Sequence, residues 1–256
     1  MEKKLSGNIR FSGAALALLM LALLFIPPGC AKDGGVCVTN SGTTIMEERK
    51  LDDFDSISLN DNVNLILRSD LENSVQVEAG RNIIRGITTD VVNRQLIINN
   101  KNTCNWLRSY NKPLNIYISS KNLIKIIYNS AGDILADRKL TIDSLEVEVW
   151  GGCGTIDLTF DSLWKGNFSL NMGTANIILH GKCGWTTVFA GSYGSYDARD
   201  MNAWYTGITN KGTNDCYVNA KYLDATIKSI GNIYYRMDSV KSVNPQIFGS
   251  GQVLPF

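Results

Sequence analysis

The stretch KSIGNIYYRMD, residues 228–238, places Gly231 just before a short β-type run that ends in two tyrosines. A glycine in that position either lets the backbone approach a ligand or lets the chain turn. Glycine loops that bind phosphate are followed by a helix, whereas a strand-like run follows Gly231. The local pattern therefore favours a turn, and the rest of the chain repeats it.

Seven glycine-plus-strand units follow one another at intervals of 18 to 22 residues, and their glycines are Gly132, Gly154, Gly173, Gly191, Gly212, Gly231 and Gly251. A repeat of about 20 residues is typical of solenoids, in which stacked units bury an apolar side that one unit cannot bury alone. Glycine suits each corner because the backbones of neighbouring coils come close there. The sequence predicts an all-β, single-domain β-solenoid (β-helix-like) of roughly 20-residue coils.

Short runs between the glycines alternate apolar and polar residues, as strands with one buried face do. Stacked coils should align similar inward side chains, and the expected ladder is Ile156, Ile177, Val218 and Ile233. The first third is less regular, with strand-like runs such as residues 54–68 and 74–80. We expect it to be a cap or an irregular start to the same coil.

The N-terminus has the organisation of an export signal: basic residues precede an apolar run over residues 14–26. This run of 13 residues is shorter than the roughly 20 that a membrane span needs. The cysteine that follows, Cys30, resembles the acylated cysteine of bacterial lipoproteins, although two prolines stand where that motif has Leu and a small residue. Ordinary secretion is the alternative. We expect a signal peptide over 1–29, a lipidated tether over 30–46 and one folded domain over 47–256.

Charge and cysteine content exclude some classes of function. The 25 basic and 24 acidic residues nearly balance and form no basic stripe, so no nucleic-acid partner is expected. The cysteines beyond Cys30 match no disulfide framework or zinc spacing. An exported protein could form one or two disulfides among them. We expect buried free thiols instead, and the cysteines are Cys37, Cys104, Cys153, Cys183 and Cys216.

Residues suited to catalysis are few. His180 is the only histidine, so a multi-histidine metal site is excluded and no metal or cofactor is expected. Cys183 lies three residues away, and on a strand the two side chains point to opposite faces. Coiled β enzymes that cut polysaccharides use carboxylates, or a base beside bound calcium, and the charged residues here form no concentrated cluster. We therefore predict no catalytic residue.

Two kinds of surface residue are candidates for other roles. Aromatic rings that face outward on successive coils could bind sugars or a partner protein, and the candidates are Trp204, Tyr234 and Tyr235. An Asp-Ser-apolar motif that resembles an O-glycosylation acceptor of some Gram-negative bacteria occurs four times, at Ser56, Ser144, Ser162 and Ser239. A turn followed by a strand explains the same motif without any modification.

Five segments together resemble the head-GIN domain family, whose members are often labelled auto-transporter adhesins: FDSISLNDNVNLILR (54–68), SVQVEAG (74–80), LNIYISSKNLIKIIYNSAGDI (114–134), LDATIKSIGNIYYRMDSV (223–240) and FGSGQV (248–253). The likeness covers about residues 47–256. The family's Gly-Ser-Gly-Asp units are degraded here, for example to Ser-Ala-Gly-Asp at 130–133. The resemblance implies a β-coil domain on lipid-anchored envelope proteins, and it carries no catalytic motif.

These observations predict a non-enzymatic cell-envelope lipoprotein of a Gram-negative bacterium. We expect its N-terminal lipid to anchor it in a membrane, and in the outer membrane rather than the inner one. Its expected work is that of an adhesin, binding a glycan or an envelope protein along one side of the coil. The alternative is a polysaccharide lyase or hydrolase, and a third possibility is a structural part of an envelope assembly. An open groove with converging carboxylates and basic residues would favour the enzyme, and outward aromatic rings would favour binding.

Overall fold

The computed structural model describes residues 40–69, 73–102 and 114–256, and the regular structure in this part is almost entirely β. Its one helical element is a 3-10 turn, η1 (Ile84–Gly86), and no helix there is long and apolar enough to cross a membrane. The strands are β1 (Thr44–Glu48), β2 (Ser56–Asp61), β3 (Asn64–Arg68), β4 (Ser74–Gly80), β5 (Ile87–Val92), β6 (Gln95–Asn100), β7 (Asn115–Ser119), β8 (Lys125–Ser130), β9 (Ile134–Ala136), β10 (Ser144–Gly152), β11 (Thr155–Leu170), β12 (Asn176–Ala190), β13 (Tyr196–Asn210), β14 (Cys216–Ile227), β15 (Ile233–Tyr235), β16 (Ser242–Ile247) and β17 (Val253–Pro255).

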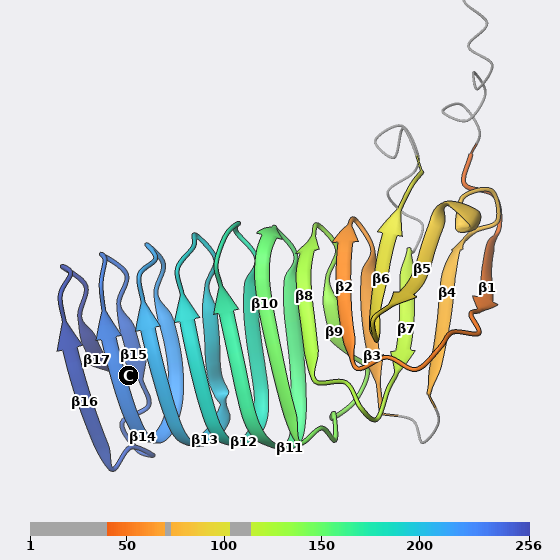
Figure 1. Cartoon of the computed structure of the whole chain (residues 1–256). Coiled ribbons are helices and arrows are strands. Elements are labelled where there is room, and N and C mark those ends of the chain that lie inside the picture. Colours follow the sequence, from red (N-terminus) through yellow and green to blue (C-terminus); the bar gives the residue numbers. More distant parts are fainter. Residues whose placement is uncertain (1–39, 70–72, 103–113) are drawn as a thin grey trace, which may run out of the picture. The chain divides into compact units, whose positions relative to one another are not determined.

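From β8 onward the chain winds as a solenoid with two β faces (Figure 1). Strands β11 to β14 each continue through a bend, so that their first halves pair in parallel on one face and their second halves on the other. These four strands begin 20 or 21 residues apart, at Thr155, Asn176, Tyr196 and Cys216. The predicted all-β solenoid of roughly 20-residue coils is confirmed.

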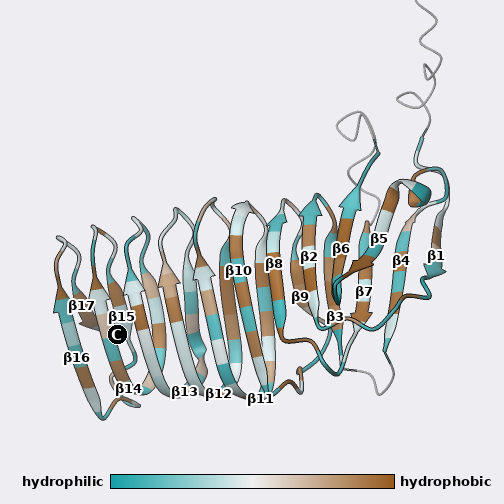
Figure 2. Cartoon of the chain, in the orientation of Figure 1, coloured by the Kyte–Doolittle hydropathy of each residue, from teal (hydrophilic) through white to brown (hydrophobic). Residues whose placement is uncertain are grey.

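Inward side chains form ladders that run through the stack, and Figure 2 shows the alternating hydropathy that produces them. One ladder consists of Leu65, Ile134, Ile156, Ile177, Tyr196, Cys216, Ile233 and Val253. Ile156, Ile177 and Ile233 lie where the sequence placed them, but the prediction for Val218 is wrong. Val218 pairs with Tyr235, one inward position further along, because the strand after Gly212 already begins at Cys216.

Glycines occupy the corners where neighbouring coils touch through their backbones. A Cβ on Gly154 would lie 2.3 Å from the carbonyl oxygen of Gly132, well inside van der Waals contact. A Cβ on Gly231 would lie 2.3 Å from the carbonyl oxygen of Asn214, and the Gly231 N–H donates to the Gly212 carbonyl at 3.4 Å. Gly231 is therefore a turn residue of a coil, as predicted.

The first third is both part of the stack and a cap on it. Strands β2 and β3 form a coil that lies between the coil of β6 and β7 and the coil of β8 and β9, with parallel pairing on both sides. Strand β4 pairs antiparallel with β1 and β7, and β5 pairs antiparallel with β6. Strand β1 begins at Thr44, within the segment expected to be a tether.

The last coil leaves β16 and β17 with one open edge each, and both strands carry a proline there. Phe248 and Phe256 donate their backbone N–H groups to the preceding coil. Backbone N–H groups of successive strand residues point alternately to the two neighbouring strands. The backbone nitrogens of Pro245 and Pro255 therefore face the open edge. Proline has no N–H to offer a further strand, so this edge is protected against edge-to-edge pairing.

The cysteines differ in exposure. Cys183 and Cys216 are buried free thiols, as expected, and burial raises the pKa of Cys216 to about 12. Cys153 is also free but exposed, so the expectation of burial is wrong for this residue, which lies in the turn between β10 and β11. The other cysteines lie outside the described residues: Cys30, Cys37 and Cys104.

Candidate functional site

The bend between the two faces carries two outward residues in a row. In β11, Trp164 and Lys165 are exposed while Leu163 and Gly166 are buried. In β13 and β14 the two residues between the buried positions are also outward, although all of them except Trp204 are half-buried. An ordinary strand presents every second residue, so the bend doubles the density of outward side chains. We call this surface the aromatic corner, and it consists of Trp164, Lys165, Trp185, Trp204, Tyr205, Lys221, Tyr222 and Lys241.

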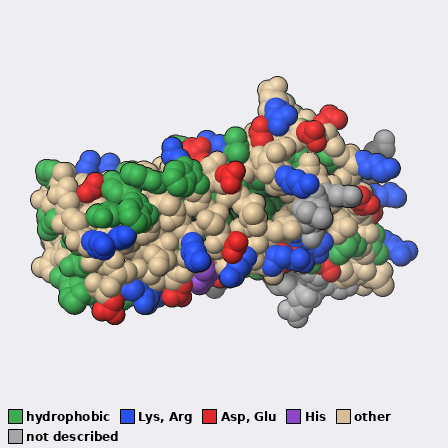
Figure 3. Space-filling model, turned by 90° about the horizontal axis from the view of Figure 1, so that it is seen from below, with side chains coloured by type: hydrophobic (Ala, Val, Ile, Leu, Met, Phe, Trp, Pro, Cys, Tyr) green, Lys and Arg blue, Asp and Glu red, His purple; other side chains and the backbone are tan. Residues whose placement is uncertain are grey.

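The register of the strands arranges these residues in columns along the stack. One column runs through Lys165, Trp185, Tyr205, Tyr222 and Ser242. In the neighbouring column, a Cβ on Gly184 would lie 3.2 Å from the Trp164 ring, so the glycine leaves room for that indole. Figure 3 shows hydrophobic side chains gathered beside Lys and Arg side chains at this edge, over the C-terminal half of the solenoid.

Aromatic rings in the aromatic corner pack against one another and stay open to solvent. The ring centroids of Trp185 and Tyr205 lie 4.7 Å apart, and those of Trp204 and Tyr222 lie 5.4 Å apart. The Lys221 ammonium sits 3.7 Å from the Trp204 ring centroid, a cation–π contact. Trp164, Trp185 and Trp204 nevertheless remain 68%, 47% and 50% exposed.

A hydrogen bond fixes the position of one of these rings. The Tyr205 hydroxyl donates to a carboxylate oxygen of Asp224 at 2.7 Å, and this bond raises the pKa of the phenol. The ring thereby lies beside Gly207, where a Cβ would stand 3.2 Å from the Tyr205 oxygen.

Small residues occupy the inward position at the bend in β12, β13 and β14, where β11 has a leucine. Cys183 pairs with Leu163 on one side and Ala203 on the other, and Ala203 pairs with Ala220. The Cys183 thiol donates to the carbonyl oxygen of Trp185 at 3.4 Å, and burial raises the pKa of this thiol. Cys183 faces the core, whereas His180 faces outward.

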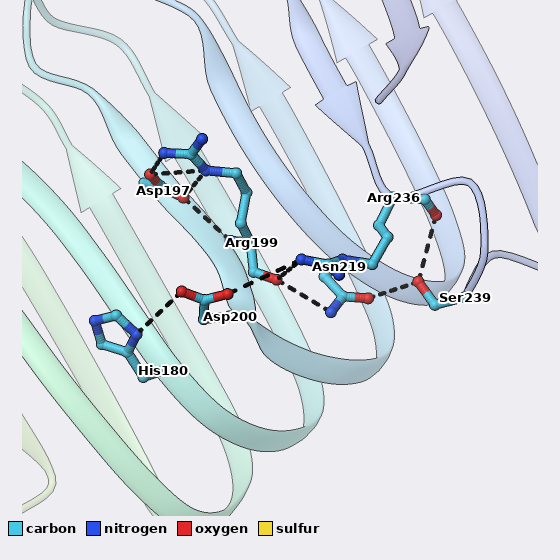
Figure 4. A network of polar contacts seen from close by, with 7 residues as sticks. All are labelled: His180, Asp197, Arg199, Asp200, Asn219, Arg236 and Ser239. Carbon is cyan, nitrogen blue, oxygen red and sulfur yellow. Dashed lines mark hydrogen bonds and ion pairs between the residues drawn. The ribbon is translucent and has the colours of Figure 1, made fainter.

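A second group of polar side chains lies on the outer surface of the face that the first halves of β12 and β13 form. We call it the charged hollow (Figure 4). Its ionisable residues are His180, Asp197, Arg199, Asp200 and Arg236, and together with Ile178, Leu179 and Phe256 they line a space of about 420 Å³. The prediction that charged residues form no cluster is thus wrong at this place. The reason is the parallel stacking, which brings residues about 20 positions apart side by side.

The ring of His180 lies between two carboxylates. Its Nε2 is 3.1 Å from Asp157 Oδ1 and its Nδ1 is 3.7 Å from Asp200 Oδ2. Arg199 Nε donates to both carboxylate oxygens of Asp197, at 3.0 and 3.1 Å. Partial burial works to raise the pKa of Asp197, but the hydrogen bonds from Arg199 outweigh burial and the pKa is lowered.

Arg236 joins the charged hollow to the next bend. Its Nη2 donates to the backbone carbonyl of Arg199 at 3.1 Å and lies 3.9 Å from Asp200 Oδ1. Asn219 donates to the same carbonyl at 3.1 Å. Among the described residues, no group of three His, Cys, Asp or Glu side chains could hold a metal ion.

The aromatic residues singled out from the sequence do not form one site. Trp204 belongs to the aromatic corner, whereas Tyr234 stacks on Tyr217 on the other face with ring centroids 5.1 Å apart. Tyr235 packs against the core. Trp164 and Trp185 were not among these three candidates, since alternation alone cannot say which side of a bend a residue takes.

The four serines of the Asp-Ser motif occupy different settings. Ser56 and Ser144 are half-buried at the first positions of β2 and β10, where the motif marks the start of a strand. Ser162 is exposed in the bend of β11. The Ser239 hydroxyl donates to Asn219 Oδ1 at 2.6 Å.

Residues 53–238 match the family model described as "Putative auto-transporter adhesin, head GIN domain". The chain belongs to this family. A solved structure from Bacteroides fragilis, titled "putative adhesin", matches 85% of this chain and 100% of its own with a TM-score of 0.73 and 22% identity. A "Putative lipid binding protein" from Parabacteroides distasonis matches 85% of this chain and 99% of its own, with a TM-score of 0.64 and 19% identity. No curated protein matches.

These likenesses establish the solenoid fold of the head-GIN family for this chain. An adhesin-like family is consistent with a protein of the cell surface or envelope. At these identities the relatives transfer no ligand.

Proposed function

We propose that this head-GIN protein is a lipid-anchored, non-enzymatic adhesin of the cell envelope whose aromatic corner binds a glycan. The observation that carries the proposal is the exposure of three tryptophans on three adjoining strands, Trp164, Trp185 and Trp204. Exposed indole rings are costly to leave in water, and their faces suit the apolar faces of pyranose rings. The adhesin label of the family and of the Bacteroides fragilis relative supports the same function.

The proposal is tested by binding of the purified domain to an array of bacterial and host polysaccharides. The chain offers a matched pair of variants, since Trp204 and Trp150 are each 50% exposed and both lie on outer surfaces of the sheet. Trp204→Ala should weaken glycan binding about tenfold, as expected for loss of one stacked ring. Trp150 lies near the C-terminal end of β10, away from the aromatic corner. The Trp150→Ala variant should bind the same glycan with an affinity within about twofold of that of the original protein. Equal loss in both variants, or no glycan bound at all, refutes the proposal.

Anchoring through Cys30 is part of the proposal but lies outside the described residues. Its support is the order of basic residues, apolar run and Gly-Cys in the sequence. Mass spectrometry of the mature N-terminus should find an acylated Cys30, and Cys30→Ala should release the protein from membranes. A mature protein that begins elsewhere contradicts this part, whereas glycan binding does not depend on it. Intact mass also tests the four serines for added sugar.

A second candidate function is hydrolysis or lysis of a polysaccharide at the charged hollow. The observation in its favour is His180 between Asp157 and Asp200, with Arg199 and Arg236 nearby. General acid–base chemistry needs such titratable pairs within reach of a substrate. Incubation with polysaccharides that bind should release reducing ends or unsaturated products if this function is present, and His180→Gln should abolish the release. Intact polymer after prolonged incubation rules it out.

A further inference from the structure

The aromatic corner also carries a set of lysines. Lys165 stands in the same column as Trp185, and Lys221 covers Trp204. Lys241 directly precedes β16, and its N–H donates to the Lys221 carbonyl at 2.8 Å. In the described part of the chain none of these three lysines has a carboxylate within ion-pair distance. Three positive charges without a carboxylate partner therefore sit among the rings of the aromatic corner.

We propose that the aromatic corner binds an extended acidic polysaccharide that lies along the axis of the stack, with one sugar above each coil. This inference rests on the proposed function and names its ligand class and orientation. Lysine supplies point charges for carboxylate, sulfate or phosphate groups, and the indole and phenol rings supply stacking surfaces. A neutral glycan would leave the ammonium groups of Lys165 and Lys241 without a charged partner.

The spacing of the coils supports this orientation. Neighbouring parallel strands lie about 4.8 Å apart, which is close to the length of one pyranose in an extended chain. The corner residues come from four adjoining strands, β11 to β14, and from Lys241 directly before β16, so they span about 19 Å along the stack. Rings on successive strands, such as Trp185 and Tyr205, therefore repeat at the same interval as the sugars. A chain of about five sugars fills the aromatic corner.

The charges that flank the aromatic corner favour a single polymer chain over an anionic membrane. Exposed carboxylates precede the corner positions in the bend, at Asp161, Asp200 and Asp238. On the opposite flank, beyond Tyr222 in β14, the Asp224 carboxylate accepts a hydrogen bond from the Tyr205 hydroxyl. A flat anionic bilayer would cover both acidic flanks together with the lysines, whereas a chain one sugar wide touches the lysines and rings alone.

The test compares two series of β-1,4-linked oligomers that differ in one group. Oligomannuronates carry a carboxylate on each sugar, and manno-oligosaccharides of the same length carry a hydroxymethyl group. Calorimetric titration of the domain should give at least tenfold tighter binding of the acidic hexamer at low salt, with the preference falling as salt rises. Affinity for the acidic series should rise with length up to about five sugars and then level off, because further sugars lie beyond the corner.

Variants separate the roles of the lysines and of the fold. Lys165→Gln and Lys241→Gln should each lower the affinity for the acidic hexamer about two- to fivefold, as expected for an exposed charge pair. Lys228→Gln, an exposed lysine after the end of β14 and away from the bend, is the control and should change nothing. Circular dichroism checks that each variant keeps its β structure.

The outcomes distinguish this inference from the proposed function. Equal affinity for the acidic and neutral series, or affinity that keeps rising beyond eight sugars, overturns the acidic, axial ligand while leaving glycan binding intact. Both proposals are overturned if the domain binds phosphatidylglycerol vesicles but binds neither oligomer series and no glycan on the array. An unchanged affinity in both lysine variants also overturns the acidic ligand.

Discussion

Gly154 offers a direct test of why the coils need bare backbone at their corners. Its φ is not in the left-handed region, so a substitution there is opposed by space alone. An added Cβ would lie 2.3 Å from the Gly132 carbonyl oxygen and 2.4 Å from the Tyr128 hydroxyl, whereas ordinary contact begins at 3.4 Å. One coil would have to move by about 1 Å relative to the next, in a closely packed interior.

The same movement breaks a buried hydrogen-bond bridge. The Tyr128 hydroxyl donates to the Gly132 carbonyl at 2.7 Å and accepts from the Gly154 N–H at 2.9 Å. Overpacking costs about 1–3 kcal/mol, and leaving one of these buried groups unpaired costs about 1–3 kcal/mol more. Gly154→Ala should therefore lower the free energy of unfolding by about 2–6 kcal/mol, which for a domain of this size corresponds to a melting temperature lower by about 4–24 °C.

Gly151 is the matched control, because it lies three residues away in the same turn region. A Cβ on Gly151 would meet only the Asn129 side-chain oxygen, at 3.8 Å. Gly151→Ala should thus leave the melting temperature unchanged or raise it slightly, since alanine restricts the unfolded chain. Thermal unfolding followed by circular dichroism measures both variants. If Gly154→Ala has the same melting temperature as the original protein, or if Gly151→Ala is destabilised as much as Gly154→Ala, close backbone contact does not explain why glycine occupies the corners.

Two further predictions concern the thiols and the open edge. At pH 8 an alkylating reagent should modify the exposed Cys153 in the folded protein and spare Cys216 until the chain unfolds, because Cys216 is buried and burial raises its pKa to about 12. Peptide mass mapping measures the labelling of each thiol, and rapid labelling of Cys216 would contradict the prediction. Since the unfolded chain releases that proton near the ordinary thiol pKa of 9.0, stability should also fall as the pH rises above 9. Replacing Pro245 and Pro255 together by valine restores two edge N–H groups and should produce concentration-dependent oligomers in analytical ultracentrifugation; a variant that stays monomeric at all concentrations would show that the prolines do not protect the edge.

The coil repeat could be predicted because two independent patterns agree on it. Alternating residues identify strands, and the spacing from Gly132 to Gly251 gives the length of one coil. The register within the coil could not be predicted in the same way. The first inward residue follows its glycine by two positions at Gly154 and by four at Gly212, so counting from the glycine misplaced Val218.

Which aromatic residues face outward was harder to predict for a related reason. Tyr196 occupies a ladder position between Ile177 and Cys216 and is fully buried, and the small Cys216 beside it leaves room for the ring. Composition alone would place a tyrosine at the surface as readily. The charged hollow depends likewise on which residues of separate coils share a column, as His180 and Asp200 do.

The bend that disturbs the alternation is also what makes a binding surface possible. A straight strand of the stack presents one outward side chain for every two residues, about 7 Å apart along the strand. At the bend, Trp164 and Lys165 point outward together, as do Trp204 and Tyr205, because the inward positions on either side are three residues apart. A ring and a charge, or two rings, then stand side by side on one coil. The parallel register repeats that pairing on the next coils, and the rigid ladders beneath hold it in place without any closing loop. A ligand that repeats at the interval of the coils is the kind that such a surface can bind without paying to order it.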